Sequence, residues 1–420
     1  MKFCTQIDKL KLVSQKSGHS TALISPSIQV QPGISFVLFD QVRAYQAEWE
    51  AVCPPNIFFS ISFLELIEHD PPAGIKPFYA LIKSDDKIIA ALSLQLKTID
   101  LSESMNLEAG ADHMNLAQKL SQKIKKAAVK VAKFNTLICG NVLLTGEYGF
   151  CFSDKTILYA DQFQLIETVL DKIITVLPDY GYKAGPILMK DYYKDKKFSI
   201  NDDIESQFTE FAIQPNMIFQ LRDEWTNFED YKAALKSKYR VRLKRAIKKL
   251  GDVEKRELSL DDIILYNQRI YDLYMETANE ADFNLFILPL HYFSNLKKYL
   301  KEKIKIVAYF LEGEMIGYYT ILFNKDYMEA HYLGYDKSKN AERQIYLNML
   351  FDLVREGIEH QVGTIQFART ALEIKSSVGA VPYDMLCYLK HSKKSLNALA
   401  PRLLSFMVPD ESWQPRTPFK

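Results

Sequence analysis

The sequence contains the block Gly363-Thr-Ile-Gln-Phe-Ala-Arg-Thr-Ala-Leu-Glu-Ile-Lys-Ser-Ser-Val-Gly-Ala-Val-Pro382. This block begins as an apolar run typical of a buried β-strand. It then presents the polar residues Arg369, Thr370, Glu373 and Lys375. Polar groups just past the end of a buried strand are where α/β proteins usually hold ligands. The same pattern also fits a strand followed by a solvated loop and a turn, so both interpretations stay open.

Two long segments of the chain carry a similar order of expected elements. Each has helices, a β-hairpin, a strand, a helix and a further strand, with the hairpins expected at 78–96 and 304–323. The helix expected after the first hairpin covers 114–134. Such a repeated order predicts two domains, 35–215 and 216–420, after a weakly structured segment 1–34.

Composition excludes several classes of protein. The 420 residues are 48% hydrophobic and 25% charged, as in an ordinary globular protein. The net charge is +1, so the protein as a whole has no electrostatic field that would attract nucleic acid or an anionic membrane. The five cysteines form no CxxC pair and no HExxH motif occurs, so we expect no metal. No Gly-x-Ser-x-Gly motif occurs either, which gives no support to a hydrolase. No apolar run approaches a membrane span and no signal peptide is recognised, which predicts a cytoplasmic protein.

A strongly basic helix is expected at Leu235-Lys-Ser-Lys-Tyr-Arg-Val-Arg-Leu-Lys-Arg-Ala-Ile-Lys-Lys249. An apolar stripe through it would pack on a core and leave a positive face toward solvent. That face would suit a phosphate-rich partner such as CoA or tRNA. The alternative is a solvated surface balanced by nearby acidic residues.

Together, the basic helix, the segment Ala330-His-Tyr-Leu-Gly-Tyr-Asp336 and the block at 363–382 carry a resemblance to a known family. The C-terminal half resembles the FemAB/CelD-like branch of the GNAT acyltransferase superfamily, and the N-terminal half is similar in layout only. The resemblance implies an α/β (α+β) protein with two GNAT-like domains. Each domain would be a mixed, mostly antiparallel sheet flanked by helices.

The resemblance also implies a donor and a place for it. In this family acyl-CoA, commonly acetyl-CoA, places its pyrophosphate at the start of a helix, here expected near Asn340–Ile345. The family's glycine-containing phosphate loop is absent at this point, so Arg343 would supply a phosphate contact. FemX-type relatives use aminoacyl-tRNA instead, which keeps a tRNA-dependent aminoacyl transferase as the first alternative.

Candidate catalytic residues lie on the strand before that helix. A GNAT-type reaction needs a base for the attacking amine, and Glu329 and His331 alternate on the strand and should share one face, with Tyr332 on the other. Tyr335 could donate a proton to the leaving thiolate. Arg369 and Lys375 suit the binding of an anion, or else an ion pair with Glu373 or Asp384. The full set of candidate binding residues is Arg343, Gln344, Arg369, Thr370, Lys375, Tyr239 and Arg240.

The acceptor implied by the resemblance is an amine on a small molecule or a peptide. A further alternative is a non-catalytic binding protein that kept the fold. In the N-terminal half, the glycine-rich segment Cys139–Gly149 follows a strand and would either approach a ligand closely or form a simple turn.

Overall fold

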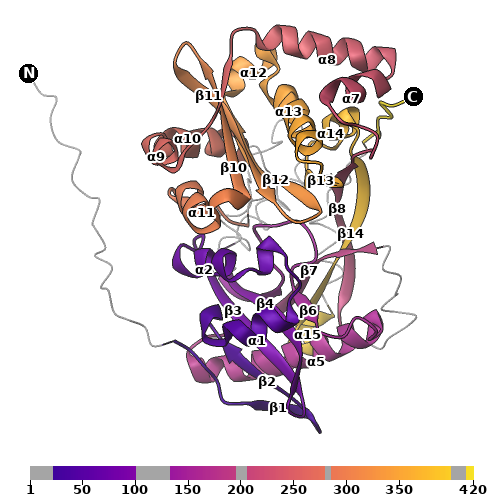
Figure 1. The fold of residues 1–420 in the computed structure, drawn as a ribbon. Coiled ribbons are helices and arrows are strands. Elements are labelled where there is room, and N and C mark those ends of the chain that lie inside the picture. Colours follow the sequence, from indigo (N-terminus) through magenta and orange to yellow (C-terminus); the bar gives the residue numbers. More distant parts are fainter. Residues whose placement is uncertain (1–21, 101–132, 195–205, 280–284, 399–412) are drawn as a thin grey trace, which may run out of the picture.

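The computed structural model describes residues 22–100, 133–194, 206–279, 285–398 and 413–420. Within these residues the strands form a single 14-stranded sheet in the order β1-β2-β3-β4-β5-β7-β14-β8-β13-β12-β11-β10-β9, with β6 paired to β4. Helices flank this sheet in both halves (Figure 1). The expected helix at 114–134 lies outside the described residues up to 132, and its last two residues belong to β5 instead.

The N-terminal half follows the expected hairpin plan. The two-residue turn Asp85–Asp86 joins β3 to β4, and Asp85 adopts φ +50°, which a hairpin turn of this length requires. The strands are β1 (Ile28–Gln31), β2 (Ile34–Phe39), β3 (Ile75–Ser84), β4 (Lys87–Asp100), β5 (Lys133–Cys139), β6 (Phe150–Phe152) and β7 (Pro186–Tyr193). The helices are η1 (Val42–Tyr45), α1 (Gln46–Val52), η2 (Ile57–Phe59), α2 (Ile61–His69), α5 (Tyr159–Val176) and η4 (Leu177–Tyr180).

The C-terminal half repeats that plan, and the turn Glu312–Gly313 has φ values of +53° and +82°. Its strands are β8 (Thr209–Gln220), β9 (Glu254–Glu257), β10 (Ile304–Leu311), β11 (Glu314–Phe323), β12 (Tyr327–Tyr335), β13 (Thr364–Gln366) and β14 (Val381–His391). Its helices are α7 (Phe228–Ala234), α8 (Ser237–Leu250), α9 (Leu260–Leu265), α10 (Asn267–Ala278), α11 (Tyr292–Leu300), η6 (Lys301–Lys303), α12 (Lys337–Arg343), α13 (Ile345–Glu359), α14 (Leu372–Val378) and α15 (Lys394–Asn397).

Each half is a mixed, mostly antiparallel sheet, which confirms the predicted fold class. Two strand pairs are parallel, β5 with β7 and β12 with β13. In each pair a helix packed on the sheet, α5 or α13, lies between the two strands in the sequence. The segment 1–34, expected to be weakly structured, contains β1, which pairs with β2.

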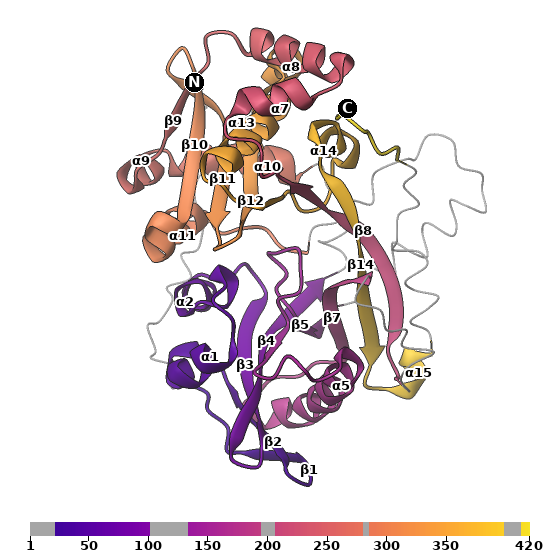
Figure 2. The ribbon, with the colours of Figure 1, turned by 45° about the vertical axis from the view of Figure 1, so that its right-hand side comes forward.

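Two long strands, β8 and β14, run through both halves of the molecule (Figure 2). β14 pairs with β8 along its length and with β7 through Met385–His391, so the end of the C-terminal half completes the sheet of the N-terminal half. The expected division at 215/216 falls inside β8. The two halves are therefore joined by continuous backbone hydrogen bonding as well as by packing.

Close packing between β12 and α10 depends on a glycine. A Cβ at Gly334 would lie 2.5 Å from the carbonyl carbon of Leu273, which is helix backbone and cannot rotate away. We expect Gly334→Ala to lower the free energy of unfolding by about 3 kcal/mol, because overpacking against backbone forces the helix outward. The measurement is urea unfolding.

Gly313→Ala serves as the comparison, since nothing lies within 4 Å of a Cβ there and only the positive φ opposes the substitution. We expect it to cost about 1 kcal/mol. Equal losses for the two variants would contradict the close contact at Gly334.

Candidate functional site

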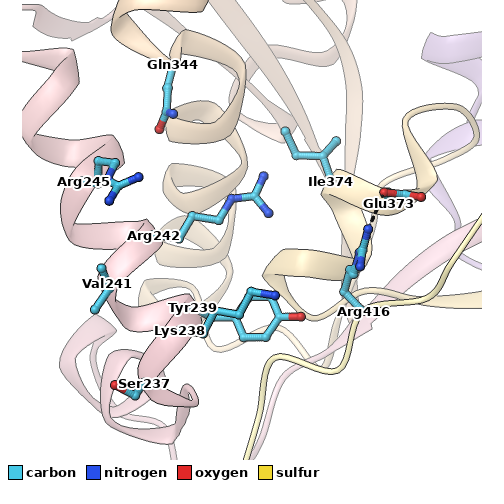
Figure 3. A pocket seen from close by; sticks show the side chains of 10 residues that line it. All are labelled: Ser237, Lys238, Tyr239, Val241, Arg242, Arg245, Gln344, Glu373, Ile374 and Arg416. Atoms are coloured by element: carbon cyan, nitrogen blue, oxygen red, sulfur yellow. Dashed lines mark hydrogen bonds and ion pairs between the residues drawn. The ribbon is translucent and has the colours of Figure 1, made fainter.

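A pocket of about 700 Å³ lies between α8, the start of α13 and α14. Four of its lining side chains are cationic, namely Lys238, Arg242, Arg245 and Arg416, and one, Glu373, is a carboxylate. Figure 3 shows the side chain of Arg242 extending from α8 into the space between the two walls. The remaining lining residues are Ser237, Tyr239, Val241, Gln344 and Ile374.

Helix α8 presents these cations because of its apolar stripe. Leu243, Ala246 and Leu250 are buried in the core around α13. Residues 238, 242 and 245 are spaced i, i+4 and i+7, so they share one side of the helix, toward the pocket. Arg240 and Lys244 do not line the pocket. Both Tyr239 and Arg240 were predicted as binding residues, and of the two only Tyr239 lines the pocket.

The cations of α8 are available to a ligand. Neither Arg242 nor Arg245 has an ion-pair or hydrogen-bond partner among the described residues, and both side chains are exposed. By contrast, Arg343 donates from Nη1 to the carbonyl of Leu250 at 3.1 Å, so it braces the end of α8. Arg343 does not line this pocket, and its expected phosphate contact stays a prediction.

Gln344 lies where α12 meets α13 and adopts φ +52°. Its side chain lines the pocket, and its Oε1 is buried without a hydrogen-bond partner among the described residues. Tyr335 stacks its ring on Tyr346 with centroids 5.7 Å apart and does not line this pocket.

β12 and β13 pair over only three positions, Tyr327–Glu329 against Thr364–Gln366. Past Gln366 the chain turns toward β8, where the amide of Phe367 donates to the carbonyl of Met217 at 2.8 Å. The strands therefore part beyond Glu329.

The turn after β13 is strained and is held by Lys375. Three non-glycine residues, Ala368, Thr370 and Ala371, adopt positive φ between +48° and +64°. The ammonium of Lys375 donates to the carbonyls of Ala368 and Arg369. Lys375 is only 6% exposed, and this burial lowers its pKa to about 7. Thr370 is exposed and makes no described contact with the pocket.

Arg369 forms a buried ion pair with Asp191 of β7. Asp191 is fully buried and also pairs with the neighbouring Lys190, and these two cations hold its pKa below the ordinary value despite its burial. The sequence suggested Glu373 or Asp384 as partners of Arg369. This expectation is wrong because β7, from the other half of the chain, reaches the turn after β13.

Glu329 points from β12 toward the N-terminal half, while its neighbours Met328 and Ala330 pack toward α13. It is 3% exposed, and its Oε2 has no hydrogen-bond partner among the described residues. Burial raises its pKa to about 8, although Lys190 and a hydrogen bond from Tyr148 act in the opposite direction. Only the ionised carboxylate, which predominates above about pH 8, can accept a proton.

His331 and Tyr332 occupy a β-bulge. The register shifts between Tyr319 and Ile321, so Thr320 faces both residues and hydrogen bonds with the amide and carbonyl of Tyr332. As a result the two rings touch, with centroids 4.4 Å apart. The prediction that Tyr332 points to the other face is wrong, since a bulge breaks the alternation of side chains.

The imidazole of His331 is held in a ring of aromatic side chains. Its Nε2 is 2.7 Å from the hydroxyl of Tyr292, and its ring lies near that of Phe58. Burial lowers its pKa below the ordinary histidine value, so it is neutral at pH 7.

Further polar groups at this junction were not predicted as site residues. The hydroxyls of Tyr148 and Tyr327 are 3.3 Å apart, and Asn56 donates to Tyr327 at 3.0 Å. Asn216 Oδ1 and Gln366 Oε1 are buried without described partners. Tyr148 lies in the glycine-rich segment Cys139–Gly149, which was the one sequence feature that pointed to this group of side chains. Nothing in a single sequence pointed to Asn216.

A second pocket, of about 800 Å³, opens between residues 53–62 and the turn at 323–325. Asn56 lines it and so connects it, through Tyr327 and Tyr148, with the surroundings of Glu329. The described ranges contain no group of three or more His, Cys, Asp or Glu side chains that could hold a metal ion. Within the same ranges, no helix is both long and apolar enough to cross a membrane.

Comparisons with known proteins identify structures with a similar fold but no relative by sequence. No protein-family model matches the chain, and no curated protein matches its sequence. The crystal structure of FemX matches with a TM-score of 0.50 and 11% identity over 86% of this chain and 98% of FemX. A tandem GNAT protein from the clavulanic acid biosynthesis pathway matches with a TM-score of 0.45 and 9% identity over 86% of this chain and 99% of its own. The match to FemX shows that the two chains share a fold.

Proposed function

We propose that this protein transfers an acyl group from acyl-CoA, held by its phosphates in the pocket beside α8, to an amine. The observation that carries the proposal is the pocket itself, where four cationic side chains face a single carboxylate. Arginine forks bind phosphate oxygens in pairs, and Arg242 and Arg245 have no described partner of their own. Gln344 at the start of α13 adds an amide where unpaired backbone N–H groups favour anions.

The chemistry we propose uses both faces of the sheet. The donor would lie on the α13 face and present its acyl group where β12 and β13 part, beyond Glu329. The amine would approach from the face of Glu329, by way of the pocket that Asn56 lines. The neutral amine nitrogen attacks the thioester carbonyl and the new C–N bond forms. The C–S bond breaks, CoA leaves as its thiolate with the electron pair, and the proton of the amine passes to Glu329.

Glu329 suits the role of base better than His331 does. A general base is most effective when its pKa lies near the working pH. The pKa of Glu329 is raised to about 8, whereas burial moves the pKa of His331 away from neutrality. His331 would instead orient the amine as a neutral hydrogen-bonding group, held by Tyr292.

An aminoacyl-tRNA donor is the second candidate, and one observation favours it. Helix α8 also carries exposed cations outside the pocket, at Lys244, Lys248 and Lys249. A donor confined to the pocket would not contact all of these, whereas a nucleic acid would.

Replacing Arg242 by glutamate tests the donor pocket. We expect the affinity for CoA to fall about 30-fold, because a charge-assisted hydrogen bond is lost and a repulsion is added. Titration calorimetry with CoA measures the change. Lys244→Glu makes the same charge change on the same helix outside the pocket, and we expect it to leave the affinity for CoA within about twofold.

The same two variants separate the donors. Binding of tRNA should weaken in both and should fall steeply with salt, since both positions would lie along the nucleic acid. Equal effects of both substitutions on CoA would remove the pocket as its site. A protein that binds either donor without any transfer to a panel of amines would be the non-catalytic alternative.

A further inference from the structure

Residues 413–420 lie against the pocket and are firmly attached there. Phe419 stacks on Phe219 of β8 with centroids 5.9 Å apart and an interplanar angle of 7°. The backbone of the segment continues this attachment, because the amide of Lys236 donates to the carbonyl of Pro418 at 2.8 Å. Gly379 leaves room for the ring, since a Cβ there would meet Phe419 at 2.5 Å.

This attachment carries Arg416 into the wall of the pocket. Its amide donates to the hydroxyl of Ser376 on α14 at 3.0 Å, and its Nη2 is 2.9 Å from Glu373 Oε2. Arg242 extends toward this ion pair from the opposite wall (Figure 3). Residues from two distant parts of the chain, α8 and 413–420, therefore face each other across the cavity.

The ion pair between Arg416 and Glu373 is open to exchange. Their side chains are 38% and 50% exposed. A pair this exposed contributes little to stability, because water screens both charges. A phosphate that enters the cavity could therefore take the place of the carboxylate at small cost. A phosphate also offers an arginine the same paired geometry as a carboxylate does.

We propose that Arg416 is an anion-binding residue of the pocket and that Glu373 is its resting counterion, displaced when the ligand's phosphate binds. This inference rests on the proposed function for the identity of the ligand, but the exchange itself requires only an anion. Residues 413–420 then form part of the binding site. An incoming anion must compete with Glu373 for the guanidinium of Arg416.

Binding measurements on the full chain test the exchange without relying on catalysis. The probes are CoA and inorganic tripolyphosphate, followed by titration calorimetry in Arg416→Gln, Glu373→Gln and the double variant. We expect Arg416→Gln to weaken binding about tenfold and Glu373→Gln to tighten it about threefold. In the double variant, the affinity should equal that of Arg416→Gln alone, because Glu373 affects binding only through Arg416.

Glu314→Gln provides the matched control. Glu314 forms a similarly exposed ion pair with Lys339 at 3.1 Å, away from the pocket, so its removal should not change either affinity. Thermal unfolding of each variant verifies that 413–420 remains attached.

The outcomes separate this inference from the proposed function. Unchanged binding in Arg416→Gln, together with a loss in Arg242→Glu, overturns the role of Arg416 and leaves the donor pocket standing. A gain from Glu373→Gln that persists without Arg416 overturns the counterion role. A wild-type protein that binds neither probe overturns both this inference and the proposed site of the donor.

Discussion

Glu329→Gln is expected to slow acyl transfer to an amine by roughly 100-fold or more, the typical contribution of a general base. The amide keeps the shape of the side chain in its buried position, so the loss would come from the missing proton acceptor. In the wild type the rate should rise with pH toward about 8 and level off above it, because only the ionised carboxylate accepts a proton. The variant should lack this ascending limb.

The measurement is release of free CoA thiol from acetyl-CoA with a panel of amines, recorded from pH 6 to 9. Tyr335→Phe is the companion variant. If its rate is unchanged, the leaving thiolate does not depend on Tyr335, which is stacked on Tyr346. A Glu329→Gln variant with the wild-type rate and the same pH limb would exclude Glu329 as the base.

The same substitution has a consequence for stability. The pKa of Glu329 is raised from 4.5 in the unfolded chain to about 8 in the fold. Its contribution is therefore fully present below pH 4.5 and is lost as pH rises to about 8, because the unfolded chain releases the proton first. We expect Glu329→Gln to flatten this decline, so that it unfolds less readily than the wild type at pH 8.5 and similarly at pH 4.5.

Local patterns in the sequence predicted those parts of the fold that local forces determine. The hairpins follow from two-residue turns with positive φ at Asp85, Glu312 and Gly313. The basic helix follows from an apolar stripe, of which Leu243 and Leu250 are buried. Ile247, expected in the same stripe, is 46% exposed, and Ala246 is buried instead. Gln344 and Tyr239, which were both predicted as binding residues, line the same pocket.

Long-range pairing determines what the sequence did not reveal. No local pattern indicates that β14 crosses to β7, which is why the partner of Arg369 is Asp191. The bulge in β12 depends on its register with β11, so Tyr332 cannot be oriented from alternation alone. Arg416 reaches the pocket only because Phe419 packs on β8, a contact about 200 residues apart in the chain.

Lys375 holds a turn in which three non-glycine residues have positive φ, and burial of its charge opposes that role. Its ammonium donates to two carbonyls of the turn, but the desolvation of the charge lowers its pKa from 10.5 to about 7. A neutral amine makes the same contacts without the cost of burying a charge. The turn should therefore be held more strongly as pH rises above 7.

Lys375→Met is expected to remove this pH dependence. For a lysine whose folded pKa is depressed, stability is present above the unfolded pKa of 10.5 and is lost as pH falls toward the folded value of about 7. The free energy of unfolding of the wild type should then rise by about 2 kcal/mol from pH 7.5 to 9.5, and the variant should not show this rise. Urea unfolding across this range, with the exposed Lys244→Met as control, gives the comparison.

Lys375→Met should also lower the rate of acyl transfer by about tenfold or more. The reason is that no other described side chain holds Ala368, Thr370 and Ala371 at their positive φ values. Relaxation of the turn would move Arg369 relative to Asp191 and change the opening between β12 and β13. CoA affinity should change little, since Lys375 does not line the donor pocket. Stability curves that stay parallel to the wild type, with the transfer rate unchanged, would show that the turn holds its shape without Lys375.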